Sequence, residues 1–170
     1  MSEESESAEA AAARPVINIE GDLVALGPLR RDLLGDYHRW NNDFGVTHAL
    51  ARSGPTTLEE EATAYDAVAR DATFRCFTVY ERATSRPIGT TYLARIDHRN
   101  RCAEFGIALG EADCHGKGYG TEVTRLILDY AFTVLGLNNV ELTCRADNLA
   151  GLRAYEKAGF KEVGRRRQCR

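Results

Sequence analysis

The sequence contains no run of 18 or more apolar residues, which excludes a membrane-spanning helix. It also lacks an excess of basic residues: 22 Lys and Arg against 25 Asp and Glu give a formal net charge of -3, which argues against a dedicated nucleic-acid-binding protein. The N-terminus, MSEESESAEA, lacks the basic and apolar stretches of a secretory signal. Neither a membrane nor a nucleic acid is therefore an expected partner.

Cysteine is also scarce and scattered. The five cysteines include no CxxC pair, and an odd number argues against a secreted disulfide framework. Neither a zinc knuckle nor any other metal site is indicated. A reducing cytoplasm is the predicted location.

The 170 residues are enough for one domain, and 44% hydrophobic residues are enough to fill its core. Residues 1–15 carry four Glu and one Arg, a net charge of -3, so residues 16–170 sum to zero. This leader has too few large apolar side chains to bury anything. We therefore expect a disordered acidic leader over 1–15 and a single domain over 16–170.

The periodicity of apolar residues predicts strands and helices in mixed order. The expected strands cover residues 16–26, 74–81, 88–96, 102–109, 140–144 and the stretch from 161 onward. The expected helices cover 30–42, 57–70, 123–134 and 148–158. Runs of both types predict an α+β or mixed α/β fold.

The sharpest motif is a glycine loop, His115-Gly116-Lys117-Gly118-Tyr119-Gly120-Thr121, between a strand and a helix. Glycines at alternate positions let the backbone curl so that its N–H groups converge, and a helix N-terminus adds partial positive charge. The loop therefore predicts a phosphate or pyrophosphate site. It matches neither a Walker A loop, because Gly118 follows Lys117, nor a dinucleotide fingerprint, because residue 121 is Thr. A glycine-rich linker without a ligand is the alternative.

A second motif covers residues 148–160, Asn-Leu-Ala-Gly-Leu-Arg-Ala-Tyr-Glu-Lys-Ala-Gly-Phe. Asn148 is a natural N-cap, and Tyr155 lies two turns into the helix that follows. Taken alone, Tyr155 is interpreted as a core or half-buried aromatic residue.

Together the two motifs resemble the GNAT superfamily of acyl-CoA-dependent N-acyltransferases. Its glycine loop, Arg/Gln-x-x-Gly-x-Gly/Ala, corresponds to residues 115–120, and its Asn/Tyr helix corresponds to 148–160. Residues 20–29 and 40–43 resemble the branch of ribosomal-protein N-terminal acetyltransferases, which also includes polyamine and antibiotic acetyltransferases. The resemblance covers about 16–168. It implies a central mixed, mostly antiparallel sheet flanked by helices.

The sequence departs from the family in two places. His115 stands where many members have Arg or Gln, which matters little if backbone N–H groups hold the pyrophosphate. The fold normally closes with a hairpin of two strands, whereas this sequence has room for only the first before Arg170. The last strand is expected to be missing, to lie beyond Arg170, or to come from a partner, as in a homodimer.

The resemblance implies acetyl-CoA as the acyl donor and assigns residues to it. The pantetheine arm would pair with the third strand of the meander at Ile107, Ala108 and Leu109. The diphosphate would sit on the amides of 116–121. Asn148 would hold the pantetheine arm or a water molecule, and the N–H near Ile107 would stabilise the oxyanion.

The resemblance also implies the proton transfers. Tyr155 would protonate the departing thiolate. Glu104 would act as the base through water, although a solvated strand carboxylate is an equal alternative. Asp97, His98 and Glu141 are reserve candidates for the base.

The acceptor is expected to be a primary amine, either a protein N-terminus or a small molecule. Its pocket would be formed by the first two helices and their loop, including Trp40, Asn41, Asn42 and Asp43. A structural role is the interpretation for His38. The alternative to an enzyme is a non-catalytic acyl-CoA-binding module with the same fold.

Two further patterns are interpreted as having no role in catalysis or binding. Cys114 and His115 are adjacent, but sequence neighbours rarely face each other as a nucleophilic pair. The arginines at 165, 166, 167 and 170 are interpreted as a solvated edge.

Overall fold

The computed structural model describes residues 14–47 and 54–167. The predicted acidic leader therefore lies almost entirely outside the described residues. Six strands form one sheet in the order β1-β2-β3-β4-β5-β6. Their bounds are β1 Ile19–Glu20, β2 Val24–Pro28, β3 Arg75–Glu81, β4 Pro87–Asp97, β5 Cys102–Leu109 and β6 Asn139–Glu141. All neighbours pair antiparallel except β5 and β6, which are parallel, so the predicted mixed, mostly antiparallel sheet is confirmed.

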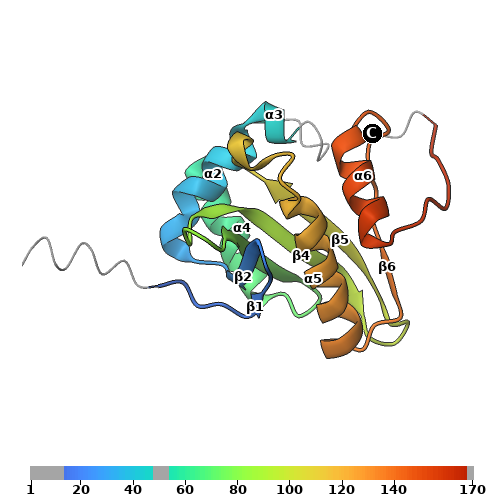
Figure 1. Cartoon of the computed structure of the whole chain (residues 1–170). Helices are drawn as coiled ribbons and strands as arrows, with labels where there is room; N and C mark the ends of the chain where they lie inside the picture. The colour runs from blue at the N-terminus through green and yellow to red at the C-terminus, as the bar shows by residue number, and fades with distance from the viewer. Residues whose placement is uncertain (1–13, 48–53, 168–170) are drawn as a thin grey trace, which may run out of the picture.

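Helices cover both faces of this sheet (Figure 1). The long helices are α2 Leu34–Asn42, α4 Leu58–Arg70, α5 Tyr119–Asp129 and α6 Leu149–Ala158. Shorter turns are η1 Arg31–Leu33, α3 Phe44–Thr47 and η3 Ala112–Cys114, while a π-helical turn, η4 Tyr130–Val134, extends α5. In Figure 1, α5 crosses one face of the sheet with α6 beside it, and α2 and α4 lie toward the other face.

The main core lies between the sheet and α5. One side of α5 carries Val123 and Ile127, and the turn η4 continues that side with Ala131; all three are fully buried in one cluster with apolar strand residues such as Val79 and Leu93. The four-residue spacing of these positions puts them on one helix face. Burying each large side chain contributes about 1.5–3 kcal/mol relative to exposure, so α5 is firmly fixed on the sheet.

Local sequence signals set several element ends. The predicted capping box begins α4: Thr57 accepts from the backbone N–H of Glu60, and Glu60 accepts from that of Thr57. Gly136, with a φ of +66°, follows the π-helical turn, and Gly159, with a φ of +107°, ends α6. These are the left-handed conformations that glycine adopts without strain.

Two predicted strands differ from the structure. The strand expected over 140–144 ends at Glu141, and the strand expected from 161 onward is not formed in the described residues 161–167. All seven of these residues are exposed, and none pairs with a strand of the described sheet. Because no neighbouring strand supplies hydrogen bonds, nothing fixes this segment in an extended conformation. Arg165 instead pairs with Glu162.

No helix in the described part of the chain combines the length and the apolar character needed to cross a membrane.

Candidate active site

The sheet opens between β5 and β6. These strands pair only at Cys102–Asn139, Ala103–Val140 and Glu104–Glu141. Beyond Glu104, β5 continues to Leu109 with no described strand along that edge. The edge therefore presents backbone N–H and C=O groups that an extended ligand can pair with. It contains Ile107, Ala108 and Leu109, the residues predicted to hold pantetheine.

The glycine loop follows this edge and leads into α5. Gly116 and Gly118 have φ values of +74° and +86°, so both positions require the freedom of glycine. Gly118 is the N-cap of α5, and no side chain caps the helix. The first-turn N–H groups of a helix have no intrahelical acceptor, so this terminus is suited to an anion. The two left-handed glycines agree with the curled backbone expected of this loop, and the phosphate site itself stays a prediction.

Three elements converge at Gly120. An added Cβ at this position would lie 3.9 Å from Leu109 Cδ1 and 4.0 Å from Ala154 Cβ. Gly120 thus brings together the end of β5, the first turn of α5 and the middle of α6. This contact places Tyr155, the neighbour of Ala154, beside the open edge of β5.

Tyr155 lies in an aromatic cluster. Its ring packs edge-on against Phe105 at a centroid distance of 6.1 Å and against Phe160 at 6.2 Å. Burial raises the pKa of the Tyr155 phenol to about 12, and negative charge on neighbouring Cys144 or Tyr92 adds to the shift. Tyr155 is therefore protonated at neutral pH, as a general acid must be.

Asn148 begins α6 as predicted. Its Oδ1 accepts from the backbone N–H of Gly151 at 3.0 Å. The same side chain lies over Gly151, where an added Cβ would approach Asn148 Nδ2 to 2.7 Å. The cap therefore engages the oxygen of Asn148 and leaves its NH2 group to carry the predicted cofactor contact.

Glu104, the predicted base, forms an ion pair with Arg95. Arg95 has a φ of +51° in the irregular register between Ala94 and Asp97, a bulge that re-aims its side chain. Asp97 and Glu141 line the same hollow of about 220 Å³ as this pair. The structure thus brings three of the four candidate bases together.

The predicted acceptor residue Trp40 is 3% exposed. Its Nε1 donates to Glu111 Oε1 at 2.8 Å, and Arg39 donates to the same oxygen at 2.6 Å. Its ring covers Gly110 so closely that a methyl group there would overlap it. Trp40 therefore fixes α2 against the end of β5, and its buried position offers no face to an acceptor.

The neighbouring polar residues hold the chain after α2. Asn41 donates to Glu61 at 2.7 Å, and exposed Asp43 accepts from the N–H of Gly45 at 2.8 Å. Asn42 bonds both the N–H and the carbonyl of Thr56.

The carbonyl of Thr56 also accepts from Nε2 of His38 at 2.8 Å, in agreement with the structural role predicted for His38. Asn41, Asn42 and Asp43 thus position this loop, and their contact with an acceptor stays a prediction.

Cys114 and His115 have separate partners. Cys114 is buried and contacts Arg86 Nη2 at 3.3 Å, and burial raises the pKa of its thiol. His115 Nε2 donates to the carbonyl of Leu109 at 3.2 Å. The last candidate base, His98, is exposed in the turn after β4. Among residues 14–47 and 54–167, no three His, Cys, Asp or Glu side chains cluster as metal ligands.

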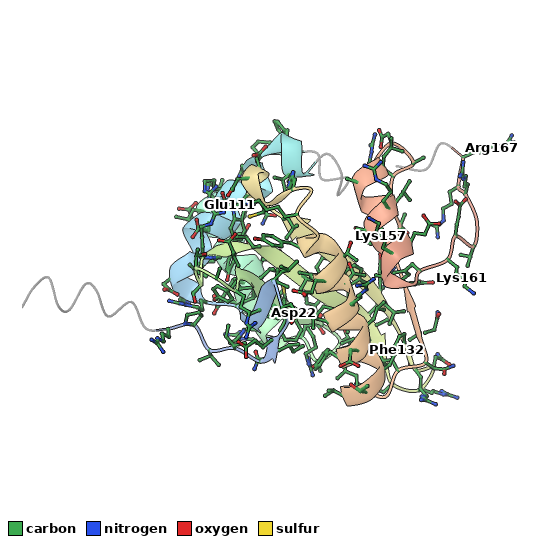
Figure 2. The ribbon with its side chains drawn as sticks, in the orientation of Figure 1. Asp22, Glu111, Phe132, Lys157, Lys161 and Arg167 are labelled. Carbon is green, nitrogen blue, oxygen red and sulfur yellow. The ribbon has the colours of Figure 1, made fainter. Side chains whose placement is uncertain are left out.

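An open groove of about 800 Å³ lies beside the N-terminus of α5, and sequence reasoning missed its cationic residues. Its lining includes Gly118, Thr121, Arg82, Arg125 and Lys157. Figure 2 shows Lys157 on α6, on the side toward α5. These cations come from three separate segments, so no local pattern groups them.

Glu122, which lines the same groove, ties the β1–β2 turn to the first turn of α5. Its carboxylate accepts from the backbone N–H groups of Asp22 at 3.1 Å and of Leu23 and Val24 at 2.8 Å each. The carboxylate neutralises these otherwise unpaired amides and ties the first strands to α5.

Comparison with known proteins agrees with this architecture. A family model described as an acetyltransferase (GNAT) domain matches residues 24–161. The spermidine N(1)-acetyltransferase of Escherichia coli K12 is 31% identical over 141 residues, covering 83% of this chain and 74% of that protein. A mouse alpha/beta-tubulin N-acetyltransferase 9 is 27% identical over 154 residues, covering 84% of this chain and 64% of that protein.

Among solved structures, the spermidine N-acetyltransferase of Vibrio cholerae, in complex with CoA and spermine, superposes with a TM-score of 0.79. It is 28% identical, and the match covers 85% of this chain and 84% of that one. The predicted fold and the predicted class of enzyme, an N-acetyltransferase, are confirmed. The chain belongs to the GNAT acetyltransferase family.

Proposed function

We propose that the protein transfers the acetyl group of acetyl-CoA to a small-molecule primary amine, with the thioester lying along the open edge of β5. The observation that carries this proposal is the coincidence of two unpaired features: the edge of β5 beyond Glu104 and the uncapped N-terminus of α5. The strand edge pairs with the amides of pantetheine, and the helix terminus binds the diphosphate. The related Vibrio cholerae structure contains CoA, which agrees with this donor.

The groove beside α5 would bind the remaining phosphate of the cofactor. Arg82, Arg125 and Lys157 line it next to Gly118. Arg125 already donates to the carbonyl of Lys157 at 2.8 Å, which holds its guanidinium near the groove. Arginine and lysine near a helix N-terminus supply the charge that a phosphate monoester requires.

The residues support direct transfer. The lone pair of the neutral amine attacks the thioester carbonyl carbon, and the carbonyl oxygen becomes an oxyanion stabilised by a backbone N–H near Ile107. Collapse re-forms the C=O bond and breaks the C–S bond. Tyr155 gives its proton to the departing thiolate, and the proton lost by the attacking nitrogen restores the phenol through Glu104 and solvent. The products are the N-acetyl amine and CoA.

The relatives support the choice of a small-molecule amine. The Escherichia coli and Vibrio cholerae proteins are spermidine acetyltransferases, and spermine is present in the solved complex. In this chain Asp97, Glu104 and Glu141 line one hollow, which favours a cationic acceptor, while Arg95 neutralises one of the three. Spermidine, spermine and a peptide with a free N-terminus are therefore the first acceptors to compare.

Thermal unfolding with CoA and acetyl-CoA tests the donor site. A ligand at about 100 times its Kd adds about 2.7 kcal/mol of stability, which gives a clear shift. Release of free thiol in the presence of each amine then tests transfer. A protein that binds CoA but releases no thiol with any amine would be the non-catalytic module.

Tyr155→Phe tests the general acid. We expect acetyl transfer to fall about 10²–10⁴-fold while CoA binding is retained, because only the proton donor is lost. Tyr65→Phe on α4 is the matched control, since the Tyr65 hydroxyl meets the Leu29 carbonyl at 3.4 Å, away from β5. The pKa of Tyr155, about 12, also predicts no loss of rate between pH 8 and 10. Unchanged turnover in the variant would remove Tyr155 from the mechanism.

Alkylation of Cys144 tests where the thioester lies. Cys144 is half-buried near Tyr155, whereas Cys102 is half-buried at the far end of β5. CoA should slow modification of Cys144 and leave Cys102 unchanged, as measured by mass spectrometry of the alkylated peptides. Equal protection of both thiols would contradict this placement.

A further inference from the structure

Tyr92 lies over a gap that one glycine leaves in β5. Tyr92 on β4 pairs directly with Gly106 on β5, so their side-chain positions share one face of the sheet. A Cβ at position 106 would overlap the far end of the Tyr92 ring, including its hydroxyl. The Tyr92 side chain therefore reaches across β5 toward the open edge, through space that only glycine leaves free.

The surroundings hold the ring but leave its hydroxyl free. Phe74 stacks on Tyr92 with a centroid distance of 5.2 Å and an interplanar angle of 23°. Thr91 donates to the carbonyl of Gly106 at 3.0 Å, which fixes the backbone under the ring. No group in the described part of the chain hydrogen-bonds to the Tyr92 hydroxyl. This hydroxyl is not among the buried polar atoms of the described residues, so it is open to solvent and to a ligand that lies along the edge.

Tyr92 and Tyr155 reach the edge from opposite faces of β5. Tyr155 packs on Phe105, whose side chain alternates with Gly106. The two phenols are close enough that charge on Tyr92 contributes to the raised pKa of Tyr155. Glu104, two residues before Gly106, lies on the same face as Tyr92.

We propose that Tyr92 positions the acceptor: its hydroxyl oxygen accepts a hydrogen bond from the attacking amine and aims the nitrogen lone pair at the thioester carbonyl. This inference rests on the proposed function, because it requires the thioester at the edge of β5. Tyr155 then approaches the sulfur from one face and leaves the opposite face to the amine. Phe74 and Tyr92 form the wall along which the carbon chain of the amine lies.

A bisubstrate ligand tests this without turnover. In CoA-S-CH2-CO-NH-butyl, the amide N–H takes the place of the amine N–H. Calorimetry of this ligand and of CoA would be compared in wild type, Tyr92→Phe and the control Tyr65→Phe. Tyr92→Phe keeps the ring and its stacking on Phe74 and removes only the oxygen.

We expect the bisubstrate to bind wild type more tightly than CoA, and Tyr92→Phe to lose about tenfold in bisubstrate affinity with CoA affinity unchanged. With an amine that is turned over, kcat/KM for the amine should fall by a similar factor, with KM for acetyl-CoA unchanged. Equal loss for CoA and bisubstrate, or no loss for either, overturns the inference. So does a wild type that binds the two ligands equally. Failure of wild type to bind CoA at all overturns the proposed function itself.

Discussion

At the two ends of the open edge of β5, an aromatic ring covers a glycine, but the two rings have different roles. Near the start of the open edge, Tyr92 covers Gly106; just past its end, Trp40 covers Gly110. Trp40 is buried, and its N–H is bonded to Glu111. The Tyr92 hydroxyl has no partner within the described residues, and its ring is only half-buried.

This difference separates packing from chemistry. A glycine beneath an aromatic ring shows only that two elements approach closely. The role of the ring depends on its polar atom. The N–H of Trp40 is hydrogen-bonded and helps to fix the structure, whereas the hydroxyl of Tyr92 has no protein partner among the described residues and is available to a ligand at the open strand edge. The predictions below change each side of this comparison in turn.

Gly110→Ala should have the largest effect on stability. The added methyl group meets the root of the buried Trp40 ring, which cannot swing away without breaking its bond to Glu111. We expect a loss of about 3 kcal/mol in the free energy of unfolding, measured in urea. A loss below the error of the measurement would show that α2 can move off β5.

Gly106→Ala should cost less stability and more activity. Its methyl group meets the far end of Tyr92, a side chain that can rotate outward, so we expect a loss of about 1 kcal/mol. Acetyl transfer should nevertheless fall about tenfold or more as the phenol is displaced. In a Tyr92→Ala background, Gly106→Ala should cost little further stability, and the rate should stay low; additive losses in stability would contradict the contact.

Glu111 links the Trp40 end to pH. The Arg39 hydrogen bond, aided by Trp40 and opposed by burial, holds the pKa of the Glu111 carboxyl below its ordinary value. Because its pKa is depressed in the folded state, the ionised Glu111 carboxylate contributes to stability above the unfolded pKa of about 4.3. This contribution is lost as the pH falls through the folded pKa. Wild type should therefore lose about 1 kcal/mol more than Glu111→Gln between pH 5 and pH 3, measured by denaturation at each pH. Parallel pH profiles would show that Glu111 does not contribute.

Gly35→Ala should have the smallest effect, in the opposite direction. Gly35 lies in α2, and an added Cβ would meet nothing within 4 Å. Alanine in a helix should stabilise the protein by about 0.5–1 kcal/mol, which thermal unfolding can measure. If Gly35→Ala instead destabilised the protein, α2 would be sensitive to any added methyl group. The loss expected for Gly110→Ala could then not be assigned to its contact with Trp40.

Sequence reasoning located the elements whose signals are local. The strand 102–109 has the bounds observed for β5, and the Thr57–Glu60 capping box begins α4. The positive φ values of the glycine loop follow from residues close in sequence. Each of these depends on alternation, capping or turn geometry within a few residues.

Long-range contacts explain what was missed. Tyr92 meets Gly106 only because the bulge at Arg95 and the turn after β4 set the register. A glycine at an inward position of a predicted strand is the signal that points to a covering ring. Trp40 was expected to face an acceptor, but its partners, Glu111 and Gly110, lie 71 and 70 positions away, beyond any local pattern.

The anchor made by Glu122 has a consequence for synthesis on the ribosome. Its carboxylate holds the backbone of residues 98 to 100 positions earlier in the chain. The β1–β2 turn emerges first but lacks its acceptor until α5 has been translated and has folded onto the sheet. A nascent chain stopped before residue 122 would therefore expose the unpaired amides of its own first hairpin, the stage at which a chaperone would find them.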